Sequence, residues 1–489
     1  MQTVNQIFHK SYKGIQVNYC VSAECENFGN SDPSLYESVE NNRNLNIYFC
    51  PKCGSYPQII NNKAVYQAVE YQKKYHETTL ISCPNEGCTS HELAVHAYPD
   101  RYRAFGKTKT LKQRFQCREC SKVFTDRFSG TNPNLELQHA IFYGMKYGQG
   151  VRNLCSIEGI TPKTFYSLQR EMVDRLKYLA HVKETKFYNQ PGDCLLSSSY
   201  RFVKEATGVM LVASVHNPSG YVLGFDTNLS KNIDKSCLLP LRKKSKKRAA
   251  LNENKQDLML DILSGYDRIM SRTNYLDPMS NGENLSRSRL HELTQPYLSS
   301  FAHALVMHNN LKGKSRRYYF VEQDTMLRNA FINASLEHLL KENDQLFYYK
   351  ESSQKIDWFD NSKLHIRRVG WWKDKWGFVT DSDKTRAACH IKGNNLSNEL
   401  WSKLILEADL HGVEQYLRKA SKYVGSLIHT VNHQSINDWL HVFTAYYNYS
   451  LPNKNGKTPA QLMGFFDRPV GLGELLSGQF NYCAPRKAQ

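Results

Sequence analysis

CPNEGC (83–88) and CREC (117–120) form a paired-cysteine pattern that also occurs earlier in the chain, as CVSAEC (20–25) and CPKC (50–53). In both copies, two cysteines separated by four residues are followed, after 24 or 28 residues, by two cysteines separated by two. Such short spacings let two thiolates reach one tetrahedral metal ion, and a second pair completes its four ligands. The repeat predicts two zinc ribbons, with the ligands Cys20, Cys25, Cys50 and Cys53 in the first and Cys83, Cys88, Cys117 and Cys120 in the second.

The remaining cysteines and the start of the chain support metal ligands over disulfides. The start, MQTVNQIFHKSYKG, lacks the apolar core of a secretion signal. No stretch approaches the roughly 20 apolar residues that a membrane span needs. Paired cysteines in such a chain are expected to bind metal, and we expect a cytoplasmic, nucleoid-associated protein without membrane contact. Five cysteines are scattered as ordinary thiols are: Cys155, Cys194, Cys237, Cys389 and Cys483.

The charge balance favours a polyanionic partner. Lys and Arg number 64 against 46 Asp and Glu, a net charge of +18, and each phosphate that a cation neutralises releases condensed counterions. A soluble protein that is merely basic is the alternative. Six cations between the cysteine pairs make the second ribbon the better DNA-contact candidate: Arg101, Arg103, Lys107, Lys109, Lys112 and Arg114. A purely structural role is the alternative for either ribbon.

The densest charge block is predicted to lie on a surface loop. Either this loop is simply solvated, or it clamps phosphates. Its candidate DNA-binding residues are Arg242, Lys243, Lys244, Lys246, Lys247 and Arg248.

Residues 148–172, GQGVRNLCSIEGITPKTFYSLQREM, predict a helix-turn-helix. Gly159 supplies the turn, and Thr161 with Pro162 provides a cap followed by a first-turn proline. The second helix would read the major groove, although any two packed helices joined by a glycine turn resemble this layout. Three residues of that helix are expected inward, Phe165, Leu168 and Met172, and four outward as DNA contacts, Lys163, Thr164, Ser167 and Arg170.

From about residue 192 the pattern becomes rich in strands. A strand at 194–203 precedes a hairpin of 209–215 and 220–226, whose turn is NPSG. A strand ending at 318–324, a helix at 327–340 and a strand near 346–349 follow. This order predicts a mixed sheet of the ribonuclease H type.

Four passages in order along the chain resemble bacterial insertion-sequence transposases of the DDE, ribonuclease H-like superfamily. They are QRFQCRECSKVFTDRF (113–128) with the helix-turn-helix behind it, SGYVLGFDTN (219–228), YYFVEQDTMLRNAFINA (318–334), and GVEQYLRKA (412–420) with its tail AYYNYSLPNKNGKTPAQLMG (445–464). The resemblance spans roughly residues 83–464.

The resemblance implies three acidic residues that hold two Mg²⁺ or Mn²⁺ ions for strand cleavage and transfer. The third acid maps to Glu414. The second maps to the end of the 318–324 strand, where Asp324 is favoured with Glu322 beside it or replacing it, both on one face if the strand continues. At the first position the chain has LLSSSY (195–200) instead of an acid. Asp193 is the nearest carboxylate, and Asp226 could substitute only if the metal site were rearranged.

The expected fold is multi-domain α+β: zinc ribbons at 1–70 and 71–132, a helix-turn-helix domain at 133–185, a ribonuclease H-like domain at 190–430, and C-terminal helices at 431–489. Two functional hypotheses follow. The first is a transposase that binds element ends as a homo-oligomer on double-stranded DNA and cleaves them. The second is a catalytically inactive, transposase-derived DNA-binding protein acting as a repressor or targeting factor. A zinc-ribbon component of transcription machinery fits less well.

Overall fold

The computed structural model describes residues 10–39, 47–78, 80–203, 208–230, 257–272, 274–278, 293–341, 343–352, 363–370, 372–381, 384–393, 395–428 and 430–477. The chain divides into two compact units, each assembled from two separate segments: 1–75 with 191–421, and 76–190 with 422–489. The α+β class is confirmed, with a large mixed sheet and two four-cysteine clusters. In the described part of the chain, none of the helices has the length and apolar character that crossing a membrane requires.

The first unit is built around an eight-stranded sheet with the order β11-β12-β13-β10-β9-β6-β7-β8. Strand β6 runs parallel to β9, and β9 runs parallel to β10, whereas all other neighbours in the sheet are antiparallel. The strands are β6 (Asp193–Phe202), β7 (Met210–His216), β8 (Tyr221–Thr227), β9 (Arg316–Val321), β10 (Asp344–Ser352), β11 (His365–Val369), β12 (Asp374–Thr380) and β13 (Thr385–Lys392).

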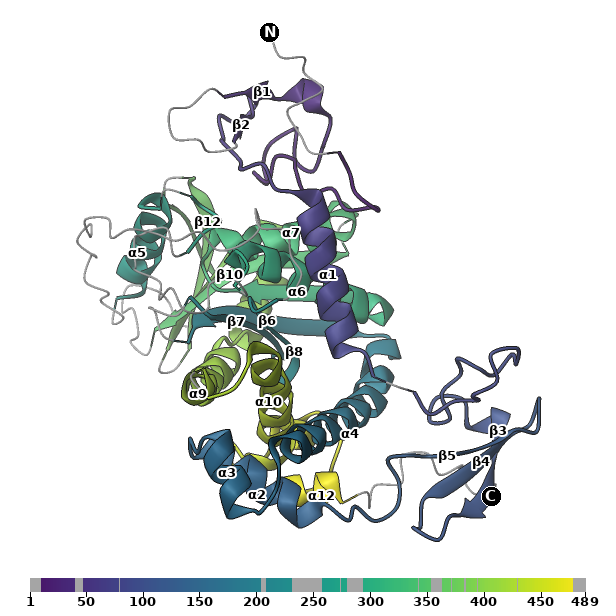
Figure 1. Cartoon of the computed structure of the whole chain (residues 1–489). Coiled ribbons are helices and arrows are strands. Elements are labelled where there is room, and N and C mark those ends of the chain that lie inside the picture. The colour runs from purple at the N-terminus through teal and green to yellow at the C-terminus, as the bar shows by residue number, and fades with distance from the viewer. Residues whose placement is uncertain are drawn as a thin grey trace. The chain divides into compact units, whose positions relative to one another are not determined.

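The central strands are buried along most of their length because helices cover the sheet. The sequence of β7, MLVASVH, and the second part of β9, YYFV (318–321), are nearly continuous apolar runs, as expected of strands covered on both faces. Helix α6 (Pro296–Asn310) packs on β7 and β8, and α7 (Thr325–Leu340) packs on β9 and β10. Figure 1 shows α6 and α7 together on one side of the sheet. The other helices of this unit are α1 (Asn62–His76), α5 (Leu258–Met270), α8 (Asn398–Glu407) and the first part of α9 (His411–Leu427).

The predicted strands and helix of this unit occur within a few residues of their expected bounds. The exception is the end of β9, which was predicted to reach residue 324 and stops at Val321. The strand ends there because Asp324 is the N-cap of α7: its carboxylate accepts the backbone N–H of Met326 at 2.8 Å. The condition under which Glu322 and Asp324 would share one face is therefore not met.

A buried relay of polar groups crosses the sheet under α6. The Ser198 and Ser214 hydroxyls lie 2.6 Å apart, and Ser214 lies 2.7 Å from Nε2 of His303. The other ring nitrogen, Nδ1, lies 2.7 Å from the carboxylate of Asp226. All four residues are buried. A polar chain in this position is stabilising only while every member keeps its partner.

We expect His303→Leu to destabilise the protein by roughly 3 kcal/mol, because Asp226 and Ser214 would lose their imidazole partner inside the core. Urea unfolding followed by circular dichroism measures the change. The double variant His303→Leu/Asp226→Leu should be less destabilised than the sum of the two single variants. A sum of single effects equal to the double effect would show that the two groups do not interact.

The second unit contains a small antiparallel sheet and a helical bundle. The sheet has the order β3 (Tyr102–Lys107), β4 (Gln113–Cys117) and β5 (Val123–Thr125). The bundle contains α2 (Leu135–Lys146), α3 (Val151–Ile157), α4 (Pro162–Asn189), α10 (His433–Ala445), the π-helical turn η8 (Tyr446–Ser450), α11 (Pro459–Leu462) and α12 (Leu472–Leu476). Helix α4 packs on α10, where the Gln169 amide donates to the carbonyl oxygen of Ser435 at 3.1 Å.

Candidate functional site

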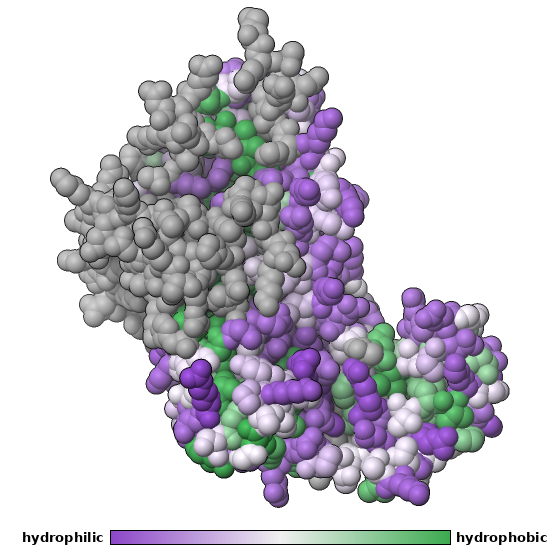
Figure 2. Space-filling view, in the orientation of Figure 1, coloured by the Kyte–Doolittle hydropathy of each residue, from purple (hydrophilic) through white to green (hydrophobic). Residues whose placement is uncertain are grey.

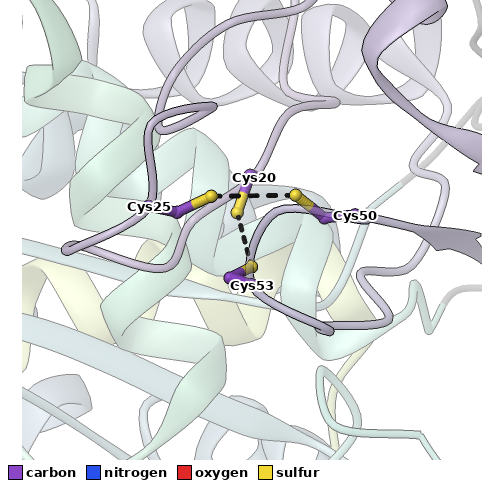
Figure 3. Close-up of side chains that lie close together, drawn as sticks. All are labelled: Cys20, Cys25, Cys50 and Cys53. Carbon is purple, nitrogen blue, oxygen red and sulfur yellow. Dashed lines mark hydrogen bonds between the residues drawn. The ribbon is translucent and has the colours of Figure 1, made fainter.

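The eight paired cysteines form two separate clusters, as the spacing predicted. In the first cluster the Sγ atoms of Cys20 and Cys53 are 3.5 Å apart and those of Cys25 and Cys50 are 3.7 Å apart. Figure 3 shows these four side chains converging from two turns of the chain. A tetrahedral ion with Zn–S bonds of about 2.3 Å separates its sulfurs by roughly 3.8 Å. The donor set therefore fits zinc and not disulfides.

The second cluster has the same geometry. The Sγ atoms of Cys83 and Cys120 are 3.3 Å apart, and those of Cys88 and Cys117 are 3.7 Å apart. A hydrogen bond from the backbone of Lys122 is the main cause that lowers the pKa of Cys120 to about 6. In the same cluster, burial raises the pKa of Cys83 to about 12, and a metal ion binds the thiolate form of each ligand. Each of the two clusters could hold one zinc ion.

The first ribbon is attached to the sheet of its own unit through the turn between Cys20 and Cys25. Arg328 of α7 donates to the carbonyl oxygen of Val21 at 3.0 Å. Lys392 of β13 donates to the carbonyl oxygen of Ala23 at 2.8 Å, with its ammonium 4.6 Å from the ring centre of Phe28. Two cations thus fix the zinc turn to the sheet, and a structural role is the simplest account of this ribbon.

The second ribbon packs instead on the long helix α4. Tyr178 of α4 belongs to the apolar cluster that contains Cys83 and Cys117, and its ring stacks on Phe128 with centres 4.8 Å apart. Arg175 of α4 donates to the carbonyl oxygen of Phe128 at 2.6 Å. The second ribbon and the helix-turn-helix therefore share one helix as their support.

The helix-turn-helix segment has the predicted local structure. Gly159 adopts a φ of +63° between α3 and α4, and the Thr161 hydroxyl accepts the backbone N–H of Thr164 at 3.2 Å. The expected inward residues Phe165, Leu168 and Met172 are buried. The four expected DNA contacts, Lys163, Thr164, Ser167 and Arg170, are all exposed. Their role in DNA binding stays a prediction.

Asp324 is buried in an ion pair. Its carboxylate pairs with the guanidinium of Arg272, which follows α5, and accepts the Tyr200 hydroxyl at 2.9 Å. Both charged side chains are at most 2% exposed. Burial alone would raise the pKa of Asp324, but Arg272 and the hydrogen bonds to this carboxylate lower it.

Glu322 points the other way. Its carboxylate accepts the hydroxyl of Ser199 at 2.6 Å, whereas Asp324 meets Tyr200, the next residue of β6. Successive residues of a strand point to opposite faces of the sheet. The two acids at the end of β9 therefore contact opposite faces of β6, and Ser199, which bonds Glu322, belongs to the stretch 195–200 where the resemblance implies the first acid.

The other predicted acids are spread over the unit. Asp193 is exposed and pairs in register with Arg316, six residues before Glu322, a separation of about 20 Å along the strand. Asp226 belongs to the relay that contains Ser198, so it lies on the face opposite Ser199.

Glu414 is exposed in the first turn of α9. That helix begins near the face of β6 that carries Ser197 and Ser199, because the Ser197 hydroxyl donates to the carbonyl oxygen of Asp409 at 2.6 Å. Among the described residues, the two cysteine sets alone bring three or more metal-binding side chains within 4.8 Å of one another. The catalytic role of the four acids stays a prediction.

The sequence did not predict the arginines that lie near Asp324. Arg272 and Arg268 lie at the end of α5, in a stretch without a recognisable motif. Burial alone would lower the pKa of Arg268, but the charges of Glu322 and Asp324 raise it. The pairing of Arg272 with Asp324 can only be located once the fold brings the end of α5 close to the end of β9. The predicted basic block at residues 242–248 lies outside the described residues.

The chain matches none of the family models, the curated proteins or the solved structures with which it was compared.

We expect the protein to bind two zinc ions per chain, and Cys25→Ser and Cys88→Ser each to reduce this to one. Elemental analysis of the purified protein measures the ratio. Cys155→Ser removes a buried thiol outside both clusters and should keep two ions. An unchanged zinc content in either cluster variant would contradict the assignment of that cluster.

The second prediction from the site concerns the Arg272–Asp324 pair. Arg272→Met should destabilise the protein by about 3–5 kcal/mol, because it leaves a buried carboxylate without its cation. The pKa of Asp324 is lowered in the folded state, so its contribution is complete above the unfolded value of about 4 and declines progressively as pH falls from there through the lower folded value.

Urea unfolding between pH 7 and pH 3 tests both statements. Wild type should lose its advantage over Asp324→Asn in the acidic part of this range. The control Arg368→Met removes an exposed arginine whose guanidinium lies 3.7 Å from Glu24, and it should shift the midpoint little. Equal effects of Arg272→Met and Arg368→Met would mean that the buried pair stabilises the protein no more than the exposed pair does.

Proposed function

We propose that this protein is a zinc-dependent, duplex-DNA-binding protein of transposase-like architecture whose α/β domain no longer carries out strand transfer. One observation carries the DNA-binding part. Helix α4 buries its three predicted core residues, exposes its four predicted DNA contacts, and supports the cationic second ribbon at the same time. Two candidate DNA-contacting modules on one helix favour a single reading surface for DNA.

The sheet supports a ribonuclease H-like origin of the first unit. Five adjacent strands have the order β10-β9-β6-β7-β8, in which an antiparallel meander β6-β7-β8 continues into the parallel strands β9 and β10. A mixed sheet is what the resemblance to DDE transposases implies for this part of the chain. The remaining strands, β11 to β13, extend the sheet beyond β10 as an addition to that core.

The loss of strand transfer is inferred from the chemistry around β9. A pair of divalent cations needs several carboxylates that face one point. Here Ser199 stands beside Glu322, and a hydroxyl supplies no negative charge. Asp324 is already neutralised by Arg272 on the opposite face. These acids serve as partners of arginine and of hydroxyl groups inside the protein.

Metal-dependent strand transfer is the second candidate, and one observation favours it. Glu322 at the end of β9 and Glu414 in the first turn of α9 belong to elements that both meet the same face of β6, through Ser199 and Ser197. Mg²⁺ or Mn²⁺ ions bound at this face would activate the attacking oxygen. Glu322 and Glu414 would hold them, and Ser199 would orient Glu322.

DNA binding is tested with variants of α4. Full-length protein is used to select preferred duplexes from a random pool, and the affinity of the best duplex is measured by fluorescence anisotropy at several salt concentrations. Lys163→Ala and Arg170→Ala should each weaken binding by about 5–100-fold. The control Lys403→Ala changes an exposed lysine of α8 and should leave affinity unchanged. Equal affinities of all variants would contradict the assignment of α4.

The same selected duplex, end-labelled and incubated with Mg²⁺ or Mn²⁺, decides between the two candidates. We expect no specific cleavage. Cleavage that is lost in both Glu322→Gln and Glu414→Gln would overturn the inactive assignment and establish the second candidate. Cleavage that persists in both variants would indicate a contaminating nuclease.

A further inference from the structure

The hairpin of the second ribbon, β3 and β4 with their connecting turn, exposes two large apolar side chains. Phe105 is 41% exposed and Leu111 is 54% exposed. Every residue of β3 after Tyr102 is exposed. Figure 2 shows apolar patches among hydrophilic residues on the surface of this ribbon. Exposed apolar groups on a small zinc ribbon need a reason, because they add nothing to its core.

The backbone is irregular at the first of these side chains. The register between β3 and β4 shifts between Ala104 and Lys107, and Gly106 in this bulge has a φ of +75°. A bulge re-aims the side chain beside it. Here that side chain is Phe105, whose ring centre lies 5.3 Å from the guanidinium carbon of Arg114. The guanidinium of Arg114 thus makes a cation–π contact with the exposed ring of Phe105.

The backbone is also irregular at the second side chain. Leu111 has a φ of +62°, a region that side-chain-bearing residues rarely adopt. Its backbone N–H donates to the carbonyl oxygen of Thr108 at 2.9 Å, and the N–H of Lys112 donates to the Thr108 hydroxyl at 3.0 Å. Strain of this kind persists where the surrounding structure fixes it, and it occurs most often at functional sites.

Gly130 supports the strained turn from behind. A Cβ atom at this position would lie 2.7 Å from the carbonyl oxygen of Thr110 and 2.9 Å from the backbone nitrogen of Lys112, both closer than real contacts allow. Gly130 also has a φ of +85°. The chain therefore packs closely behind the turn at Gly130, and the Leu111 side chain is exposed on the other side.

The charge around the two side chains identifies the partner. Residues 101–114 contain six cations and no acid. Of these, Arg101 pairs with Glu119 and Arg103 contacts Gln116. Apolar groups set in a purely cationic strip fit a partner that is anionic outside and apolar inside. Duplex DNA has this character, with phosphates along its edges and stacked bases between them.

We propose that the β3–β4 hairpin is a DNA wedge. Leu111, on the same hairpin as Phe105, enters between two base pairs from the minor groove and unstacks them, while the flanking lysines contact the phosphates. This inference rests on the proposed DNA binding and adds to it a deformation of the duplex. The helix-turn-helix reads base edges, and the hairpin favours sequences that bend easily.

The test uses full-length, zinc-loaded protein and a 30-bp duplex of mixed sequence with 2-aminopurine at a central TA step, a step that kinks readily. Unstacking raises 2-aminopurine fluorescence, and anisotropy of an end label reports binding independently. Wild type should bind and raise the fluorescence severalfold. Leu111→Asn should bind within about 10-fold of wild type and lose most of the fluorescence rise, since most single contacts of an interface contribute little to its affinity.

Asparagine tolerates a positive φ, so Leu111→Asn should fold at least as well as wild type, which its zinc content and thermal midpoint verify. The control Leu340→Asn replaces a leucine of α7 that is 53% exposed and should behave as wild type. A full fluorescence rise with Leu111→Asn would overturn the wedge. Binding by wild type without any rise would also overturn it and would indicate phosphate contact alone. No binding by wild type would overturn the proposed function together with this inference.

Discussion

The end of strand β9 determines much of the first unit. Asp324 caps α7 and at the same time meets Arg272 and Tyr200, so one carboxylate stops the strand, starts the helix and holds the end of α5 against the sheet. A charged pair that is this deeply buried is costly to form and far more costly to break on one side. The same arrangement turns Glu322 toward Ser199 on the opposite face of β6. The two acids therefore have different direct partners, a hydroxyl for Glu322 and a buried arginine for Asp324, although the charges of both raise the pKa of Arg268.

Two ribbons with one cysteine spacing are used in two different ways. In the first, the peptide carbonyls of Val21 and Ala23 accept hydrogen bonds from Arg328 and Lys392, so the turn between Cys20 and Cys25 has a structural role. In the second, the cysteine turns pack on α4, while β3 remains exposed to solvent. The same arrangement of four cysteines thus belongs to a ribbon that is bonded to the rest of its unit in one case and to a ribbon with an exposed hairpin in the other.

Local patterns allowed most elements to be predicted, and tertiary contacts explain the rest. Thiolate spacing was enough for both clusters, and the glycine turn with the Thr161 cap was enough for the start of α4, because these signals act within a few residues. The extent of β9 was overestimated, since the capping role of Asp324 depends on the helix that follows. Arg272 could not be anticipated at all: about 50 residues separate it from Asp324, and no periodicity links an arginine to a distant carboxylate. The positive φ of Leu111 could not be predicted either, because leucine is not one of the residue types that typically mark a turn.

Helix α4 sets the spacing between two parts of the second unit, the ribbon and the predicted recognition residues. Tyr178 and Arg175 hold the ribbon near the middle of the helix, whereas Lys163 and Arg170 are exposed near its beginning. A helix is stiff over this length, rising about 1.5 Å per residue, so the hairpin and the predicted recognition residues are kept at a set spacing. Two rigidly spaced contacts on one duplex bind more tightly than either alone, provided that the DNA can adopt the matching shape. A wedge that bends the duplex is one physical means of bringing that match about.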